Sequence, residues 1–379
     1  MDSFLAYTRQ RQKDMIALIR EFVECESPSD DAPSVNRFAD LIAERIKDVA
    51  RVRTYPAGSF GRHMRCEFQL PGRKKTGSIL ALGHSDTVWA LGTLRSMPFR
   101  VSTGRLWGPG VYDMKAGIVF FIFAMRALRD LDVEVARNVV LQINSDEEVG
   151  STSSRPLTEE AARKSEAVLV LEPGTGLEGK LKTARKGVGS YTIKVRGRAA
   201  HAGVDFANGA SAIVEMARQI ERIAKFTRLS RGVTVNPGVI HGGTRSNVIA
   251  AECQAEIDFR VPRESDWKEL EKKFESLKAF DSRCTIEVSG GLNRPPLEHS
   301  AGVRKLFGMA KALAAELGVT LAESSTGGGS DGNFTAALGV PTLDGLGAVG
   351  EGAHAPNESI LIDRIADRTA LLAKLVAVL

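Results

Sequence analysis

Residues 77–88 read Gly-Ser-Ile-Leu-Ala-Leu-Gly-His-Ser-Asp-Thr-Val, a short apolar run that is followed at once by polar residues. An apolar run of this length, bounded by glycines, predicts a buried strand. Residues 138–144 and 167–171 predict two more buried strands, and residues 116–131, which are apolar nearly all round, predict a buried helix. This alternation indicates an α/β domain with a largely parallel sheet. The chemistry of such a domain is expected just beyond the carboxyl ends of its strands.

The middle of the chain differs, because its predicted strands alternate apolar and polar residues. The elements there follow the order β-α-β-β-α-β, which is that of a ferredoxin-like unit. They are strands at 189–197, 233–240, 248–261 and 285–288, with helices at 208–226 and 265–280. The remaining predicted elements are helices at 3–23, 34–47, 301–317 and 365–379, and a strand at 340–343. We therefore predict an α/β domain made of residues 1–179 and 291–379, interrupted by an inserted domain of residues 180–290.

The overall composition excludes several classes of protein. The 379 residues are 43% hydrophobic and 26% charged, which argues against extensive disorder. The net charge of +5 is too small to indicate a nucleic-acid or membrane partner. The four cysteines lie far apart in the sequence, which excludes a thiolate zinc finger and a disulfide scaffold. The N-terminus does not resemble a signal peptide, and no apolar run reaches the roughly 20 residues that cross a bilayer, so we expect a cytoplasmic protein.

Histidine and acidic residues stand where the predicted strands end or a helix begins. They are His84, Asp113, Glu147, Glu148 and Glu172, joined late in the chain by His354. Taken singly, such residues are most simply structural, as a hydrogen-bonded histidine, a helix cap or a solvated glutamate pair. Together they indicate a metal site, because several carboxylates at one edge would repel one another without a multivalent cation. Mixed histidine and carboxylate ligands suit zinc, with cobalt or manganese as alternatives.

Two spacings refine this interpretation. Asp86 lies two residues after His84 on an extended segment, so it can share a face with the histidine and hydrogen-bond its far nitrogen. Glu147 and Glu148 are adjacent and cannot readily point at the same spot, so one is expected to bind metal while the other handles the proton of a water molecule. This arrangement suits the hydrolysis of an amide. The other histidines (His63, His241 and His299) match no metal motif and are predicted to be structural or exposed.

These motifs, taken as a set, resemble peptidase family M20. The matching segments are 84–88 (HSDTV), 108–115 (GPGVYDMK), 146–150 (DEEVG), 171–173 (LEP), 200–203 (AHAG) and 327–331 (GGGSD). Within the family, the chain is most similar to the bacterial glutamate carboxypeptidases that hydrolyse folate-type substrates. The inserted segment lies where the family carries its lid and dimerisation domain. The resemblance therefore implies a homodimer formed through the inserted domain.

For the metal site, the resemblance implies two Zn²⁺ ions per subunit, bridged by Asp113. One ion would take His84 and Glu172, and the other would take Glu148 and His354. The peptide bond that follows Asp113 is expected to be cis.

For catalysis, the resemblance implies that Glu147 is the general base, which activates the water and later protonates the leaving amine. Asp86 matches the carboxylate behind the first histidine ligand. His201 would stabilise the oxyanion from the lid of a partner subunit.

The resemblance also suggests where a substrate carboxylate would bind. The matching residues are Asn247, Arg260, Arg294, Gly328, Gly329 and Lys180. A planar guanidinium suits a carboxylate because it can donate two parallel hydrogen bonds. Lys182 and Arg245 depart from the family pattern, so the released amino acid could be aspartate or a bulkier acidic group instead of glutamate.

The sequence thus predicts a two-zinc metallo-carboxypeptidase or amidohydrolase that releases a C-terminal, acidic amino acid from an N-acyl or peptidyl substrate. An alternative is an N-acyl-amino-acid deacylase of the acetylornithine deacetylase, desuccinylase or aminoacylase type. A third possibility, from another class, is a metal-binding regulatory protein without turnover.

Overall fold

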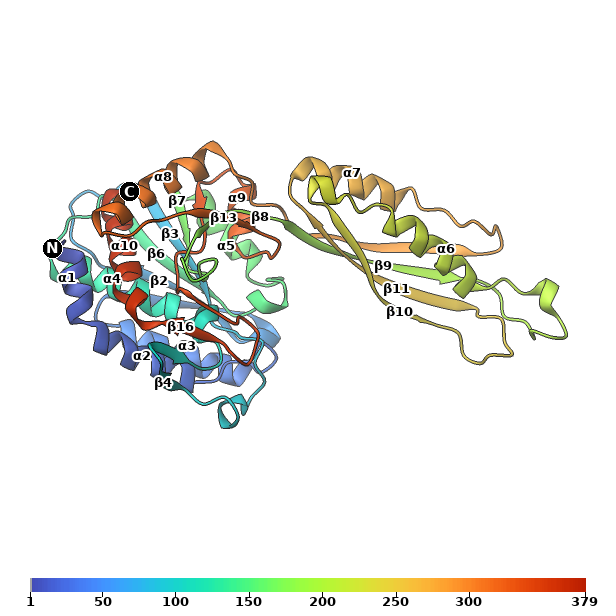
Figure 1. The fold of residues 1–379 in the computed structure, drawn as a ribbon, viewed down its shortest axis with the longest axis horizontal. Helices are drawn as coiled ribbons and strands as arrows, with labels where there is room; N and C mark the ends of the chain where they lie inside the picture. Colours follow the sequence, from blue (N-terminus) through green and yellow to red (C-terminus); the bar gives the residue numbers. More distant parts are fainter. Residues whose placement is uncertain (1) are drawn as a thin grey trace. The chain divides into compact units, whose positions relative to one another are not determined.

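The computed structural model describes residues 2–379 and divides the chain into two compact units (Figure 1). The first consists of Met1–Thr183, His299–Ser325 and Ser330–Leu379, and the second of Ala184–Glu298 and Thr326–Gly329. The domain boundaries predicted from the sequence, after residues 179 and 290, lie four and eight residues before the observed ones, after Thr183 and Glu298. The glycine-rich segment Thr326–Gly329 groups with the inserted unit, although it had been predicted as part of the α/β domain.

The first unit is built on a mixed, mostly parallel sheet. In sheet order its strands are β1 (Ala50–Pro56), β2 (Arg62–Phe68), β6 (Asn138–Asn144), β3 (Ser78–His84), β7 (Ala167–Val170) and β14 (Thr342–Leu343). Strands β6, β3, β7 and β14 run parallel to one another, whereas β1 and β2 form an antiparallel edge. The predicted fold class is confirmed.

Helices cover both faces of this sheet, which explains why its central strands are apolar throughout. Ile79 and Ala81 of β3 point into a core shared with α4, whereas Leu80 and Leu82 pack on the other face with Ala162 of α5. The helices of this unit are α1 (Ser3–Gln10), α2 (Gln12–Glu24), α3 (Ala32–Ile46), α4 (Ala116–Asp130), α5 (Arg155–Arg163), α8 (Ala301–Glu316), α9 (Gly332–Ala337) and α10 (Ile365–Val378). Helix α4 is buried along almost its whole length, as its apolar sequence predicts.

Short strands complete the structure. One sheet has the order β15 (Gly350–Glu351), β16 (Ser359–Leu361), β5 (Arg105–Trp107) and β4 (Arg100–Ser102), and β13 (Glu323–Thr326) pairs with β8 (Leu181–Arg185). The loop between β15 and β16 carries His354.

The second unit has the predicted β-α-β-β-α-β order. Its elements are β9 (Gly187–Arg196), α6 (Ala212–Ala224), β10 (Thr234–Gly242), β11 (Glu252–Val261), α7 (Glu264–Glu275) and β12 (Thr285–Arg294). The four strands form one antiparallel sheet in the order β10-β11-β9-β12. Its core contains a stack of aromatic rings in which Tyr191 and Phe259 of the sheet lie against Trp267 and Phe274 of α7.

Several local predictions were wrong. The helix predicted over 3–23 is two helices, α1 and α2, separated at Arg11. Strands β1 and β2 and helix α5 were not predicted. In β1 the exposed Arg51 and Arg53 dilute the apolar signal that marks the other strands of the sheet.

Candidate metal centre

The candidate site lies at the carboxyl edge of the three adjacent parallel strands β6, β3 and β7. Backbone pairing sets His84 opposite Asn144 and Leu82 opposite Val170, so β3 and β6 end together and β7 ends two residues earlier, with Glu172 two residues beyond its end. The segments that leave them carry His84, the Glu147–Val149 turn and Glu172. The register of the strands therefore brings these segments to one edge of the sheet, as predicted.

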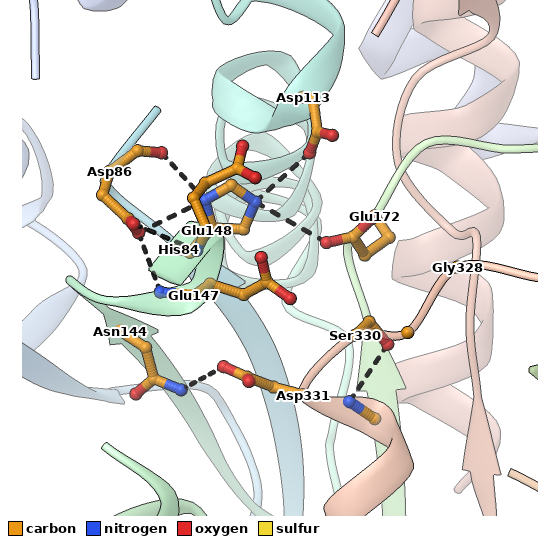
Figure 2. A network of polar contacts seen from close by, with 12 residues as sticks. His84, Asp86, Asp113, Asn144, Glu147, Glu148, Glu172, Gly328, Ser330 and Asp331 are labelled. Atoms are coloured by element: carbon orange, nitrogen blue, oxygen red, sulfur yellow. Dashed lines mark hydrogen bonds and ion pairs between the residues drawn. The ribbon is translucent and has the colours of Figure 1, made fainter. Parts of the chain in front are cut away.

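The first group of donor atoms belongs to His84, Asp113 and Glu172, which lie within 4.8 Å of one another. Nδ1 of His84 is 2.9 Å from the main-chain oxygen of Asp86, which can only accept, so Nδ1 carries the hydrogen. Nε2 faces Asp113 Oδ1 at 3.2 Å and Glu172 Oε1 at 3.6 Å (Figure 2). This tautomer leaves the Nε2 lone pair directed at the carboxylates, as a metal ligand requires.

The second group belongs to Asp113, Glu148 and His354, whose donor atoms also lie within 4.8 Å of one another. Nε2 of His354 is 3.1 Å from Glu148 Oε1 and 3.4 Å from Asp113 Oδ2. Asp113 therefore presents one carboxylate oxygen to each histidine, which is the arrangement of a bridging ligand.

Asp113 is held in an irregular turn, Val111–Lys115, that precedes helix α4. The peptide bond between Asp113 and Met114 is cis, as expected. Gly110 has φ of +72°, and a Cβ there would lie 2.8 Å from the methyl group of Thr87, so a side chain would be both strained and crowded at this position.

The carboxylates at this edge of the sheet favour a bound positive charge. Burial alone would lower the pKa of His84, but hydrogen bonds to Asp113, Asp86 and Glu172 raise it well above its usual range. Hydrogen bonds to Asp113 and Glu148 raise the pKa of His354 to about 10. The carboxylates thus draw positive charge onto the histidines, and a divalent ion would supply the same charge. The donor set fits zinc, which takes mixed nitrogen and oxygen ligands.

Asp86 lies beside Nδ1 of His84, as predicted, and also contacts a second segment. Its carboxylate Oδ1 is 3.5 Å from Nδ1 of His84, farther than its own main-chain oxygen. The carboxylate accepts hydrogen bonds from the main-chain N–H groups of Glu147 and Glu148, at 3.2 and 3.1 Å, and from Ser29 Oγ at 2.8 Å. Asp86 therefore orients the turn of Glu147 and Glu148 as well as the histidine, and Figure 2 shows the Glu147 carboxylate directed toward His84 and Glu172.

His63, predicted to be structural or exposed, is buried beneath the same turn. Its Nδ1 accepts a hydrogen bond from the main-chain N–H of Ser145 at 3.1 Å, and its Nε2 lies 3.0 Å from Ser153 Oγ. Ser153 in turn donates to Asp146 at 2.7 Å. No periodicity or spacing could have revealed this role, because His63 belongs to the unpredicted strand β2.

Acidification is expected to destabilise the protein through His63. Burial lowers the pKa of this histidine, against the opposing effects of Asp146, Asp331 and Asp86. Below about pH 6.5 the unfolded chain therefore takes up a proton that the folded protein does not, and the free energy of unfolding falls. His63→Asn keeps an acceptor for Ser145 without a titrating ring. Urea unfolding over a pH series should show a shallower acid loss for this variant, and an unchanged slope would contradict the assignment.

The remaining predicted residues, apart from Lys180, belong to the second unit. Arg260 is paired with Asp258 of its own strand at 2.9 Å. Arg294 is buried, and a Cβ on Gly329 would lie 2.7 Å from its Cδ, so glycine is needed for this approach. Asn247 is exposed, and Gly328 donates its N–H to Thr326 Oγ1 at 3.4 Å. Lys180 is half-buried in the first unit.

His201, also in the second unit, is an exposed turn residue. Its Nδ1 accepts hydrogen bonds from the main-chain N–H groups of Gly203 and Val204, at 3.1 and 3.2 Å. These bonds fix the ring and leave Nε2 as the nitrogen that carries the hydrogen in the neutral form.

Comparison with known proteins decides the family. The model of peptidase family M20/M25/M40 matches residues 80–378. The chain belongs to this family. Among curated relatives of this M20 chain, carboxypeptidase G2 of Pseudomonas sp. (strain RS-16) is 29% identical over 374 residues, covering 96% of the chain and 89% of the relative. Acetylornithine deacetylase of Klebsiella pneumoniae (strain 342) is 33% identical over 199 residues, covering 48% of the chain and 50% of the relative.

The fold of this M20 chain is also found in solved structures. The aminopeptidase PepT of Bacillus cereus ATCC 10987 superposes with a TM-score of 0.79 at 23% identity, covering 97% of this chain and 98% of that one. Membership of the family and the similarity to carboxypeptidase G2 make the M20 chain a hydrolase of the metallo-carboxypeptidase or amidohydrolase type. Among residues 2–379, no helix combines the length and the apolar character needed to cross a membrane.

Proposed function

We propose that the protein hydrolyses the amide bond of an N-acyl or peptidyl amino acid and releases the C-terminal amino acid, which is acidic. The observation that carries this proposal is the pair of donor groups that share Asp113, with Glu147 beside them. Similarity to carboxypeptidase G2 along nearly the whole chain supports the direction of cleavage.

His84, Glu172, Asp113, Glu148 and His354 would hold two zinc ions. When bound, the ions would supply Lewis acidity at the scissile carbonyl and lower the pKa of a water molecule. Glu147 would take the proton of the attacking water and return it to the leaving amine, as a general base and then a general acid. Asp86 would keep Glu147 in place, because it accepts the main-chain N–H of that residue.

The substrate's carboxylate would be recognised by cations of the second unit. Arg260 and Arg294 provide guanidinium groups, Asn247 an amide, and Gly328 and Gly329 a side-chain-free backbone. Arg260 would have to exchange Asp258 for the substrate, so its affinity for the carboxylate would be reduced by that competition. Lys180 would meet the acidic side chain of the released amino acid.

We further propose a homodimer formed through the inserted unit, with His201 reaching the reacting carbonyl of the partner's site. The support is a group of large apolar side chains that the single chain leaves in water. Val204, Phe206 and Val214 are 84%, 70% and 53% exposed. Exposed apolar side chains gathered on one unit are typical of a protein interface.

A second candidate is an N-acyl-amino-acid deacylase, which would perform the same chemistry but recognise mainly the acyl side. The similarity to acetylornithine deacetylase supports this candidate, although the similarity covers only 48% of the chain. A regulatory protein without turnover is disfavoured because Glu147 and all five proposed ligands are present.

The deciding experiment is a hydrolysis screen of zinc-loaded protein with substrates varied at both ends. N-acetyl-, N-benzoyl- and folyl-glutamate would be compared with the corresponding aspartate and leucine compounds. The proposal expects kcat/KM to depend on the acidic side chain and to tolerate changes of the acyl group. The opposite pattern would identify the deacylase, and no hydrolysis of any compound would favour the regulatory protein.

A further inference from the structure

Glu358 is a buried carboxylate whose hydrogen bonds reach the turn that carries Asp113. It lies four residues after His354 and has 0% exposure. Its Oε1 accepts the main-chain N–H groups of Tyr112 and Asp113, at 2.9 and 3.1 Å. Its Oε2 accepts the main-chain N–H of Gly110 and the indole N–H of Trp89, at 2.9 and 2.7 Å.

These four hydrogen bonds connect three segments that carry proposed metal ligands. Trp89 belongs to the segment that follows His84, Asp113 is the shared ligand, and Glu358 itself continues from His354. The main-chain oxygen of Glu358 also accepts the N–H of Gly108 at 3.4 Å, at the start of the Asp113 turn. The side chain of Glu358 therefore links the Asp113 turn to the loop of His354, beside the pairing of Ser359 with Trp107 that joins β16 to β5.

Glu358 is not itself positioned as a ligand. A carboxylate offers about four acceptor sites, and all four are directed at N–H donors here. The convergence of three main-chain N–H groups also explains why a carboxylate is required. A glutamine would turn one pair of acceptor sites into an NH₂ group that faces N–H donors, and would leave buried donors without an acceptor.

We propose that Glu358 is a positioning residue that sets the spacing of Asp113 and His354 and thereby the affinity of the second metal group. The inference rests on the proposed metal centre. It predicts that loss of Glu358 weakens the group of Asp113, Glu148 and His354 more than the group of His84, Asp113 and Glu172, because only the second group contains the loop that Glu358 anchors.

The test measures metal binding directly, so it does not depend on the substrate being identified. Co²⁺ titrations followed by absorption, and Zn²⁺ competition against a chromophoric chelator, would be carried out on the full chain. For Glu358→Gln we expect the binding step that His354→Ala abolishes to lose about 10- to 100-fold in affinity, the range for outer partners of metal ligands. Trp89→Phe removes one donor of the four and should cause a smaller loss.

Glu215 provides a matched control. It is also a buried glutamate that accepts two main-chain N–H groups, from Phe280 and Asp281 at 3.0 Å each, but it lies in the second unit. Glu215→Gln should lower the melting temperature without changing metal affinity. If Glu358→Gln behaves in the same way, with a lower melting temperature and unchanged Co²⁺ spectra and affinities, Glu358 is only structural and the proposal fails. If metal affinities fall as expected while no substrate is hydrolysed, the positioning role stands and the proposed reaction does not.

Discussion

Glu147→Gln is expected to lower kcat by about 10²- to 10⁴-fold, the usual contribution of a positioned general base, while the protein keeps its metal. The substitution preserves the size of the side chain and the main-chain hydrogen bond to Asp86, and removes only the ability to take a proton. Metal content would be measured by atomic emission, and kcat with the substrate found in the screen. Glu134→Gln makes the same charge change at an exposed position in the loop before β6 and should leave both quantities unchanged.

His201→Ala provides a second comparison for the same assay. We expect a severe loss of kcat with full metal content, because its proposed role is to stabilise the oxyanion and not to bind metal. Near-normal turnover of either variant would remove that residue from the mechanism. A loss of metal from Glu147→Gln would instead mean that Glu147 and Glu148 exchange their proposed roles.

Asp113→Ala and His354→Ala should differ in the number of metal ions that they lose. Asp113 contributes to both donor groups, so its removal is expected to lower the affinity for both metal ions by more than about 100-fold. This loss exceeds the effect of removing a residue that only hydrogen-bonds a ligand. His354 contributes to one group only, so its variant should retain one ion, held by His84, Asp113 and Glu172.

The measurement for this pair is metal stoichiometry after dialysis against a weak chelator, with circular dichroism to verify folding. Activity should be lost in the Asp113 variant and strongly reduced in the His354 variant. If both variants retained the same number of metal ions, Asp113 would not be a ligand shared by two ions. The protein would then have either two sites without a common ligand or only one site.

The sequence predicted the parts of this site that lie along the chain. Residues 77–84 predict a buried strand with a polar end, and parallel pairing then brings the segments that follow β3, β6 and β7 to the same edge of the sheet. It could not predict contacts that depend on side-chain direction. Asp86 was predicted to hydrogen-bond its neighbour His84. Its carboxylate also accepts hydrogen bonds from the main-chain N–H groups of Glu147 and Glu148, which are distant in sequence.

The contacts of His63, which was predicted only to be structural or exposed, and those of Glu358 were not predicted, for the same reason. Neither occurs at a spacing that indicates chemistry, and each acts through main-chain N–H groups that any sequence possesses. Such a role can be recognised only when the three-dimensional structure of the backbone is known. The break at Arg11 between α1 and α2 was likewise not predicted, because residues 8–14 (TRQRQKD) contain no apolar residue whose spacing could reveal where one helix ends and the next begins.

The division of the chain has a consequence for its synthesis on the ribosome. The inserted unit is nearly contiguous, so most of its sequence is available for folding while the chain is still being made. The first unit must wait, since strand β14 and helix α10 come from its last stretch. His354 also emerges late, so the metal centre is among the last features that a growing chain can complete. A nascent chain halted before residue 354 would therefore contain every residue of the inserted unit and most of the proposed catalytic residues, but not a complete metal site.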